Sequence, residues 1–453
     1  MIGSVVTDHR MPITIYRIPI TIFYIMIKTL TLTSLLFLTA CSPSIYLKKK
    51  IIAAEKELQD HTGFMLYDPA SQQTLWEYKS SHYFTPASNT KIFTLYTGLQ
   101  LLGDSVPAIK YQMLNDSLIF WGMGDPSFLY KNVFQNNRVF SFLEKSTVPL
   151  FFSGSNFQTD RFGVGWAWDD YNYAYSSERS SFPIYGNFLS VAENETGKLS
   201  VTPVYFSSQV VIGPHKKEEG EVIRDVGSNQ LTFFGGEKIV KDTIDIPFQV
   251  DDELIVELLA DTLERTVTEI SKPLPADAMV LRSIPADSLY RVMMQDSDNF
   301  IAEQILLMCA AIVSDTLRPE IAIDYMQKNY LTDLPDKPVW VDGSGLSRFN
   351  LFTPRSIVKL WEKISKQVSR ERLFTLLAVG GKSGTLKDYY KADVPYVYGK
   401  TGTLSNNHSL SGFVLTKKGK TLIFSYMSAN YIVSTSEVRK SMEVILKAIY
   451  ERY

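Results

Sequence analysis

The sequence predicts a mixed α/β fold of the α+β type, in which a domain of helices and antiparallel strands is interrupted by a β-rich insertion. Apolar residues at helical spacing occur near both ends of the chain. Short β-prone runs separated by Gly, Asn, Asp and Pro fill the stretch from 104 to 280. Two strand-like runs, 410–416 and 421–427, flank a short turn near the C-terminus. We therefore expect one domain made from 41–103 and 281–453, with 104–280 inserted into it.

The hairpin and the first helices are predicted from local patterns. Residues 46–60 are interpreted as a tether that passes into a helix. The runs 63–67 and 74–78 flank the turn cluster 68–71 and predict a β-hairpin. A helix is expected after Pro86, because apolar residues recur there at helical spacing. These apolar residues are Ile92, Phe93, Tyr96, Leu99 and Leu102.

The insertion and the C-terminal part are predicted in the same way. In the insertion, the expected strands are 117–121, 148–152, 208–212, 230–234 and 238–240. Helices return after residue 285. Thr353 and Pro354 predict a helix start, since Thr is a good N-cap and Pro suits the first helical position. The capping-box pattern from Ser434 to Glu437 predicts the final helix.

The composition excludes several classes of protein. Among 453 residues, 46 Lys and Arg stand against 48 Asp and Glu, so the chain has no general attraction to nucleic acid. Two cysteines, Cys41 and Cys309, are too few for a disulfide scaffold or a Cys-rich zinc site. The histidines form no H-E-x-x-H pair. Cys309 lies in an apolar run and is expected to be a buried thiol.

The N-terminus is typical of a signal peptide. Residues 18–40 are mostly apolar, but Lys28 interrupts them. Read from Met26, a candidate translation start, the segment has a short basic start and an apolar region from 29 to 40. That region is too short to span a bilayer. An uncut transmembrane anchor formed by 12–40 is the alternative interpretation.

The apolar region ends in Leu38-Thr39-Ala40-Cys41, which resembles a bacterial lipobox. In that class of signals the peptide is cut before the cysteine, and the cysteine carries a lipid. We therefore expect residues 1–40 to be removed and Cys41 to attach the mature chain to a membrane.

The first of three short motifs that carry chemistry is S-x-x-K, formed by Ser88 and Lys91. On a helix, these positions share one face, so the lysine amine can lie beside the serine hydroxyl. A serine hydroxyl is a weak nucleophile that needs a neighbouring base, and a buried lysine can lose its proton and serve. Near a helix start, backbone N–H groups also point towards an incoming oxyanion. An ordinary helix turn with an exposed lysine is the alternative.

The second motif is Ser297-Asp298-Asn299, which directly precedes a predicted helix. Ser297 is positioned to relay a proton between Lys91 and a leaving group. Asn299 is expected to hydrogen-bond Lys91 and a substrate amide. The alternative is a simple N-cap cluster, which these residue types favour.

The third motif is K-T-G-T, which begins at Lys400 on a predicted edge strand. Lys400 is expected to lie against Ser297, and Thr401 to bind a carboxylate. Gly402 would allow the substrate backbone to approach closely. The N–H of Thr403, together with that of the nucleophile, would form an oxyanion hole. The alternative is a β-turn with a surface lysine.

A similar K-S-G-T stretch begins at Lys382. Two predicted strands, 410–416 and 421–427, follow Lys400 and extend one antiparallel sheet. A loop-like stretch of polar and aromatic residues follows Lys382 instead. We therefore assign the motif to Lys400.

The ordered set of these three motifs resembles low-molecular-mass penicillin-binding proteins of the D-alanyl-D-alanine carboxypeptidase/endopeptidase group with a large inserted domain. Ser88 and Ser297 are too far apart in sequence for a class A β-lactamase. One departure is Met123, where the group is expected to have glycine. Further stretches that resemble the group lie at 122–127, 165–170, 342–347 and 409–412.

The resemblance implies a penicillin-binding/serine β-lactamase-like transpeptidase domain, in which an antiparallel sheet is flanked by helices. It implies a serine peptidase that acts on peptidoglycan stem peptides, with Ser88 attacking the carbonyl between two D-alanines. Lys400 and Thr401 would hold the terminal carboxylate. β-Lactam antibiotics would acylate the same serine, because their strained amide mimics the scissile bond. Together with the lipobox-like segment that ends at Cys41, the resemblance leads us to expect a lipid-anchored protein of the bacterial cell envelope that faces the periplasm.

The resemblance also suggests a substrate-binding role for Asp169 or Asp170, because an aromatic and acidic stretch near Trp168 lies by the cleft in this group. One of the two carboxylates is expected to bind the amino group of the substrate's diamino acid. A plain turn in the insertion is the alternative. Ser344, which stands between two glycines, is expected to be a turn residue that supports the site.

Two other functions are compatible with the fold. A serine β-lactamase would turn over β-lactams rapidly, whereas a non-catalytic wall-binding lipoprotein would not react with them. The intact Ser88, Lys91, Ser297, Asn299 and Lys400 favour an enzyme over the second alternative. No metal or organic cofactor is expected, because serine, lysine and backbone N–H groups supply the chemistry. The sequence leaves the choice between carboxypeptidase and endopeptidase open.

Overall fold

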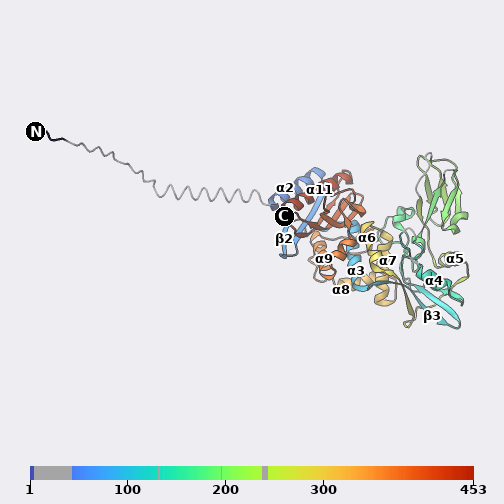
Figure 1. The fold of residues 1–453 in the computed structure, drawn as a ribbon. Coiled ribbons are helices and arrows are strands. Elements are labelled where there is room, and N and C mark those ends of the chain that lie inside the picture. The colour runs from blue at the N-terminus through green and yellow to red at the C-terminus, as the bar shows by residue number, and fades with distance from the viewer. Residues whose placement is uncertain (5–42, 131–132, 136, 195, 237–242) are drawn as a thin grey trace.

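A six-stranded antiparallel sheet is the centre of the domain that both ends of the chain build (Figure 1). The computed structural model describes residues 1–4, 43–130, 133–135, 137–194, 196–236 and 243–453. The strand order is β14-β15-β16-β17-β1-β2, so the N-terminal hairpin continues the sheet of the C-terminal strands. The strands are β1 (His61–Asp68), β2 (Gln73–Tyr78), β14 (Ala378–Val379), β15 (Val397–Leu404), β16 (Asn407–Leu415) and β17 (Thr421–Ala429).

The hairpin β1-β2 turns at the predicted cluster. Asp68 Oδ1 accepts hydrogen bonds from the backbone N–H groups of Ala70, at 3.0 Å, and Ser71, at 3.4 Å. An aspartate side chain that binds N–H groups further along the chain is a common way to stabilise a turn. The predictions of this hairpin and of strands at 410–416 and 421–427 are confirmed, although β16 and β17 begin or end a few residues away.

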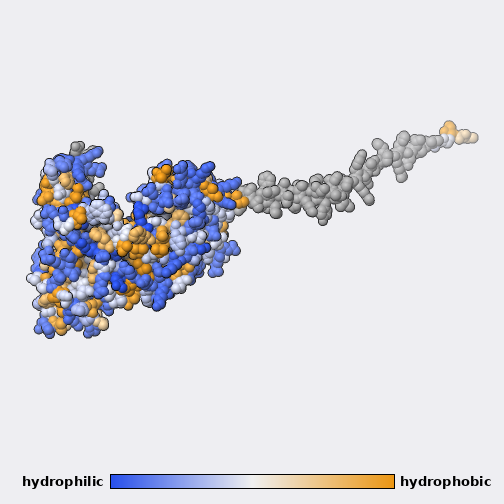
Figure 2. Space-filling view, turned by 180° about the vertical axis from the view of Figure 1, so that it is seen from behind, coloured by the Kyte–Doolittle hydropathy of each residue, from blue (hydrophilic) through white to orange (hydrophobic). Residues whose placement is uncertain are grey.

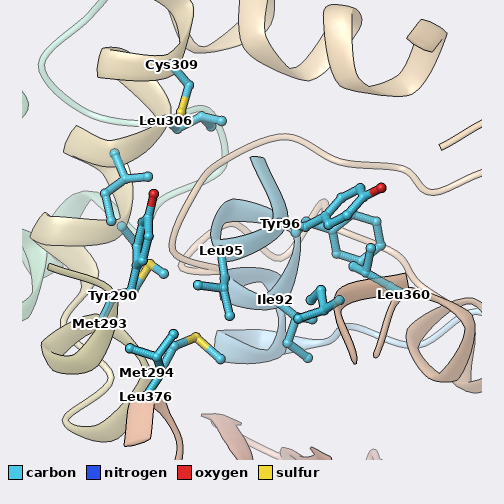
Figure 3. Packing of buried hydrophobic residues seen from close by; sticks show 14 of the residues in the cluster. Ile92, Leu95, Tyr96, Tyr290, Met293, Met294, Leu306, Cys309, Leu360 and Leu376 are labelled. Atoms are coloured by element: carbon cyan, nitrogen blue, oxygen red, sulfur yellow. The ribbon is translucent and has the colours of Figure 1, made fainter. Parts of the chain in front are cut away.

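Different helices cover the two faces of the sheet, because successive strand residues point to opposite faces. Phe424 joins the apolar cluster beneath α2 and α11, and its neighbour Ile423 joins the larger cluster on the other side. In that larger cluster Leu95 of α3 lies close to Tyr290 and Met294 of α6 (Figure 3). The helices of this domain are α2 (Pro43–Leu58), α3 (Lys91–Leu101), α6 (Ala286–Gln295), α7 (Asn299–Ser314), α8 (Pro319–Asn329), α9 (Pro354–Gln367), α10 (Arg370–Leu376) and α11 (Thr435–Arg452).

Two helices begin at the positions that their capping residues predicted. Thr353 caps α9 by accepting a hydrogen bond from the N–H of Ser356 at 3.2 Å. Ser434 and Glu437 form the capping box of α11. The helix expected after Pro86 starts as the 3₁₀ helix η1 (Ala87–Thr90) and continues as α3. Cys309 on α7 is buried and free, as expected.

The insertion contains three sheets and lies at the far end of the molecule from the C-terminus (Figure 1). The sheet orders are β12-β5-β4-β3-β13, β11-β6-β7 and β8-β10-β9. Helices α4 (Arg138–Glu144) and α5 (Asp252–Leu263) belong to the same part, and α5 packs against the largest of these sheets. The strands are β3 (Ser105–Leu114), β4 (Ser117–Gly122), β5 (Leu150–Phe152), β6 (Phe188–Glu193), β7 (Leu199–Thr202), β8 (Val210–Ile212), β9 (Glu221–Arg224), β10 (Leu231–Phe234), β11 (Ile244–Pro247), β12 (Val267–Glu269) and β13 (Met279–Pro285).

Two details differ from the predicted insertion, and one prediction is not tested. Residues 208–209 end the 3₁₀ helix η5 (Val204–Gln209), so β8 begins only at Val210. The run expected at 238–240 lies outside the described residues. β13 continues past the expected boundary at 280, because it pairs with β3 along its length, from Met279 opposite Tyr111 to Pro285 opposite Ser105.

Candidate active site

The first motif lies at the junction of η1 and α3. Lys91 Nζ donates a hydrogen bond to Ser88 Oγ at 2.9 Å, so the i, i+3 spacing brings the two groups together as expected. Ser88 is half-buried, whereas Lys91 is fully buried. The hydroxyl is thus reachable from outside while the amine is shielded from water.

Lys91 uses all three of its donors. Besides Ser88, its Nζ donates to Asn299 Oδ1 at 2.6 Å and to the carbonyl of Ser344 at 2.7 Å. Burial lowers the pKa of Lys91 to about 8, although three carboxylates nearby oppose the shift. An amine with such a pKa can both accept and return a proton near neutral pH. The carboxylates belong to Asp342, Asp298 and Glu303.

The second and third motifs meet at Lys400. Lys400 Nζ donates to Ser297 Oγ at 2.8 Å and to the carbonyl of Thr401 at 2.8 Å. Burial, and then the charge of Lys91, hold the pKa of Lys400 well below its usual value. Ser297 stands between α6 and α7 with a φ of 64°, in the left-handed region that residues other than glycine seldom adopt. The backbone there is turned so that the hydroxyl lies against Lys400.

The structure also separates Lys400 from the competing Lys382. Lys400 is buried in β15, whereas Lys382 is exposed in the turn that follows β14. That turn still reaches the site, because Thr401 Oγ1 donates to Thr385 Oγ1 at 2.7 Å. Thr385 belongs to the 3₁₀ helix η6 (Gly384–Leu386), and sequence reasoning did not assign it to the site.

Gly402 has a structural reason besides the expected approach of a substrate. A Cβ at this position would lie 2.5 Å from the carbonyl oxygen of Pro86, 2.5 Å from Ser409 Oγ and 2.9 Å from the nitrogen of Ser88. The missing side chain therefore lets β15 lie against η1. The close approach is made by the chain's own backbone around Ser88.

Asn89 fastens η1 to the sheet. Its Nδ2 donates to the carbonyl of Lys400 at 3.0 Å and to Ser409 Oγ at 2.8 Å, and its Oδ1 accepts from Ser411 Oγ at 2.5 Å. Ser409 Oγ donates in turn to the carbonyl of Pro86 at 2.7 Å. These bonds hold the first and third motifs in one rigid arrangement. The residues on β16 are part of the 409–412 stretch, but no local pattern marked Asn89.

Thr403 is exposed at the end of the site, and its hydroxyl has a buried partner. Thr403 Oγ1 and His408 Nδ1 lie 2.8 Å apart across the β15-β16 pair. Burial lowers the pKa of His408 to about 3, so the imidazole is neutral at physiological pH. His408 was not among the predicted site residues.

A loop of the insertion closes the other side of the site. Asn299 Nδ2 donates to the carbonyl of Tyr175 at 2.9 Å, and Tyr175 Oη donates to Asp170 Oδ1 at 2.8 Å. Asp170 is thus connected to Asn299 through one tyrosine, while Asp169 is exposed. The rings of Tyr173 and Tyr175 stack 5.3 Å apart. This loop comprises the 3₁₀ helices η2 (Trp168–Asn172) and η3 (Ala174–Ser176).

The arrangement therefore brings together Ser88, Lys91, Ser297, Asn299, Lys400 and Thr401. The two lysines are buried beneath, and the two serines and Asn299 are half-buried above them. From behind, the space-filling view shows a notch between the arm of the insertion and the rest of the molecule (Figure 2). Such a site can carry out acyl transfer, with a serine nucleophile, a lysine base and a cation for a carboxylate.

Comparisons with known proteins agree with this chemistry. The model of the D-Ala-D-Ala carboxypeptidase 3 (S13) family matches residues 48–449. The D-alanyl-D-alanine carboxypeptidase DacB of Haemophilus influenzae is 24% identical over 408 residues, which cover 80% of this chain and 84% of the relative. The crystal structure of penicillin binding protein 4 from the same organism has a TM-score of 0.70 and 20% identity, over 88% of this chain and 99% of that chain. A second crystal structure of that protein, complexed with a β-lactam, has a TM-score of 0.65 and 17% identity over the same shares.

Proposed function

The chain belongs to the D-Ala-D-Ala carboxypeptidase 3 (S13) family, and on this premise we propose that Ser88 is its nucleophile and Lys91 its general base. The protein is a low-molecular-mass penicillin-binding protein and a serine D-Ala-D-Ala carboxypeptidase/endopeptidase, a hydrolase. The observation that carries the residue assignment is the pair of contacts Lys91–Ser88 and Lys400–Ser297 in one site.

Acylation begins when Ser88 Oγ attacks the carbonyl carbon between two D-alanines and its proton passes to neutral Lys91 Nζ. The backbone N–H groups of Ser88 and Thr403 stabilise the oxyanion, which the closeness of Gly402 to the Ser88 nitrogen supports. The C–N bond then breaks. The leaving amine takes the proton from Lys91 through Ser297, and the acyl group remains on Ser88 as an ester.

Deacylation uses the same base. Lys91 takes a proton from a water molecule, which attacks the ester carbonyl and forms a second tetrahedral intermediate. When that intermediate collapses, Ser88 Oγ leaves and recovers its proton from Lys91. The shortened peptide departs with a new carboxylate, and the protons balance over the full cycle. Asn299 holds Lys91 in place throughout by accepting a hydrogen bond at 2.6 Å.

The terminal carboxylate of the substrate is assigned to Lys400 and Thr401. The hydroxyl of Thr401 donates a hydrogen bond to Thr385 Oγ1. A carboxylate oxygen of the substrate can take the place of Thr385 as its acceptor. Burial favours the neutral amine of Lys400. A bound anion would favour the charged ammonium form instead, because opposite charges attract. Substrate binding is thus accompanied by proton uptake.

The substrate is a stem peptide of peptidoglycan, and the test is mass spectrometry of purified muropeptides after incubation with the protein. Loss of a terminal D-alanine from uncross-linked peptides identifies a carboxypeptidase, and cleavage of cross-linked dimers identifies an endopeptidase. A Ser88→Ala variant is the control and should do neither. Cleavage by this variant at the wild-type rate would overturn the assignment of the nucleophile.

β-Lactams are proposed to acylate Ser88. The crystal structure of penicillin binding protein 4 complexed with a β-lactam belongs to a protein of the same fold and supports this proposal. A fluorescent penicillin should label the wild-type protein stably and leave Ser88→Ala unlabelled. Rapid release of hydrolysed penicillin would instead indicate a β-lactamase.

The chain is proposed to be a lipoprotein of the cell envelope that is attached through Cys41 and faces the periplasm. Cys41 lies outside the described residues, just before α2. Among the described residues, no helix has the length and apolar character needed to cross a bilayer. Exposed lysines lie around the start of α2. They support the proposed anchor, because they can bind an anionic lipid surface next to it. These are Lys48, Lys49 and Lys50 on α2, and Lys417 and Lys418, which contact the end of α11.

The lipid anchor is tested by mass spectrometry of the N-terminal peptide from membrane-extracted protein. A lipid-modified cysteine at position 41 is the expected result. Cys41→Ala should move the protein from the membrane fraction to the soluble fraction. An unmodified Cys41 in membrane-bound protein would favour the uncut anchor.

We also propose that 41–103 and 281–453 form the catalytic domain and that 104–280 is an insertion. The pairing of β1 with β17 supports the first part, because it joins both ends of the chain in one sheet. The insertion is proposed to take part in substrate recognition, since its Tyr175 contacts Asn299.

A further inference from the structure

A buried layer of charged residues lies behind the two lysines and is not used in the mechanism above. Glu303 and Asp342 are fully buried, and Arg179 is 4% exposed. They come from α7, from the 342–347 loop and from the insertion. Burial of an ionised group is costly unless close partners compensate for the lost water. The contacts of each group therefore indicate what the layer is for.

Glu303 is connected to the general base through one residue. Glu303 Oε1 accepts a hydrogen bond from the backbone N–H of Ser344 at 2.7 Å. The carbonyl of the same Ser344 accepts a hydrogen bond from Lys91 Nζ at 2.7 Å. A Cβ at Gly343 would lie 2.6 Å from the carbonyl oxygen of Ala302, so this segment is pressed against α7. Glu303 thus fixes the backbone that holds Lys91.

Asp342 organises the loop that carries this carbonyl. Its Oδ1 accepts from the N–H of Gly345 at 2.9 Å and from Asn350 Nδ2 at 2.7 Å. Its Oδ2 accepts from the N–H of Ser347 at 2.7 Å and from Trp166 Nε1 at 3.0 Å. With four donors, this carboxylate is fully satisfied by local bonds. Its main role is therefore to shape the loop.

The second oxygen of Glu303 has no such partner. Among the described residues, Oε2 accepts no hydrogen bond, and its nearest cation is Arg179, whose Nη1 is 3.8 Å away. Arg179 lies over the ring of Trp166 at 5.3 Å, and its Nε is without a hydrogen-bond partner among the described residues. The charge of Glu303 is therefore not neutralised by a close bidentate pair and acts on its wider surroundings.

The charges around Lys91 and Glu303 oppose the effect of burial. Burial lowers the pKa of Lys91, and Asp342, Asp298 and Glu303 raise it, to a final value of about 8. Burial, and then Asp342, raise the pKa of Glu303 to about 7, and Arg179 opposes them. Lys400, which donates a hydrogen bond to Ser297, is close enough to Lys91 for the charge of Lys91 to lower its pKa.

Resting on the proposed role of Lys91 as the base, we propose that Glu303 is a positioning residue for Lys91. Its carboxylate holds the Ser344 segment against the amine. It also supplies the negative charge that allows a fully buried amine beside a second lysine to keep a proton. Lys91 must keep that proton between its transfer from Ser88 and its delivery to the leaving group.

Two substitutions distinguish the effect of the Glu303 charge from the effect of its hydrogen bond to Ser344. Glu303→Gln keeps an oxygen for the N–H of Ser344 but removes the charge. It should shift the acid limb of the acylation rate to lower pH by about one unit, as expected for the loss of one nearby charge. Glu303→Asp keeps the charge but is too short for the hydrogen bond. It should slow acylation about tenfold and leave the acid limb in place.

The measurement is the second-order rate constant for labelling by a fluorescent penicillin, over the pH range in which each variant is folded. Glu362→Gln is the matched control. Glu362 is also a buried carboxylate, but it pairs with Lys359 and Lys366 on α9 and does not act on Lys91. This variant should keep the wild-type acid limb.

The outcomes distinguish this inference from the proposed function. A wild-type acid limb in Glu303→Gln, or a shifted limb in Glu303→Asp, would overturn the role of Glu303 alone. Absence of penicillin labelling in the wild-type protein would overturn the proposed function, and the role of Glu303 with it. If Glu303→Gln does not fold, Glu303→Asp still decides, because its limb and its rate are predicted separately.

Discussion

Lys400 is a cation placed where a free cation is unfavourable. It is fully buried, and its pKa is held well below the usual value by burial and by the charge of Lys91. Its partners, Ser297 Oγ and the Thr401 carbonyl, are neutral. Asp296 opposes the lowering of this pKa. A bound carboxylate would add an anion in direct contact with the amine, so the proposed role of Lys400 depends on the charge of the substrate.

We predict that the KM for a D-Ala-D-Ala peptide rises with pH as Lys400 loses its proton. The sign follows from the lowered pKa, since above it the amine is neutral and no longer attracts the carboxylate. The effect should be about tenfold, because a charged hydrogen bond contributes about 1.5 kcal/mol. The same peptide with a C-terminal amide is the control and should show no such rise. Equal pH profiles for both peptides would contradict the carboxylate role of Lys400.

Glu303 also predicts how the stability of the fold depends on pH. Its pKa is raised from 4.5 to about 7 in the folded state, chiefly by burial. The folded protein therefore binds this proton more tightly than the unfolded chain does. The stabilisation is present below about pH 4.5 and is lost as the pH rises through about 7.

Glu303→Gln should remove that pH dependence. We expect the melting temperature of the wild-type protein, relative to this variant, to fall as the pH rises from about 4.5 to about 7. Thermal unfolding monitored by circular dichroism at several pH values measures the difference. The range ends at about pH 7 because Lys91, whose pKa is about 8 in the wild-type protein, titrates above it. A constant difference across this range would contradict the raised pKa.

At the scale of elements, the site depends on how closely β15 lies against η1. Asn89 bonds η1 to the carbonyl of Lys400 on β15 and to Ser409 and Ser411 on β16. Gly402 provides the space for this contact. The proposed nucleophile on η1 and the proposed oxyanion N–H of Thr403 on β15 therefore belong to two elements that lie close together because Gly402 has no side chain.

Gly402→Ala should slow acylation by about 10²-fold without unfolding the protein. The new Cβ would lie 2.5 Å from the Pro86 carbonyl oxygen, so η1 must move away from β15. A displacement of about 1 Å at a reacting group can cost this much rate. Penicillin labelling rates measure the effect. Gly235→Ala is the control, since the nearest atoms to its Cβ are 3.8 Å away. Unchanged labelling by Gly402→Ala would contradict the proposed contact.

At the scale of the whole molecule, the insertion supplies one wall of the active site. The Tyr175 carbonyl accepts from Asn299, so the η2–η3 loop is fixed to the catalytic domain. Trp168 on the same loop is 79% exposed and offers an aromatic surface beside the site. The insertion can therefore select substrates without contributing to bond breaking.

We predict that Asp170→Asn lowers kcat/KM for a stem peptide with a free side-chain amine by about tenfold, through loss of a charged contact. Penicillin acylation should be unchanged, because the chemistry is left intact. For the same peptide with an acetylated amine, the wild-type protein and the variant should have equal kcat/KM. Asp169→Asn, on the exposed neighbour, is the matched comparison. A larger effect of Asp169→Asn would assign the amine contact to Asp169 instead.

Local sequence patterns predicted several of the elements and the three motifs. The hairpin turn at Asp68, the caps of α9 and α11, and the i, i+3 pair Ser88 and Lys91 all follow from residues close together in the chain. Local backbone geometry decides such features, so a single sequence reveals them. β13 extends past residue 280, the proposed end of the insertion, because it pairs with β3.

How the three motifs meet, and which residues support them, depends on the packing of segments that are distant in the sequence. Lys91 contacts Asn299 across 208 residues of sequence, and Asn89 contacts Ser409 across 320. The contacts of Glu303 with Ser344, and the space left by Gly402 for η1, exist only where distant segments pack together. No local pattern marks these residues, because burial and long-range hydrogen bonds, which define their chemistry, arise from the folded chain alone.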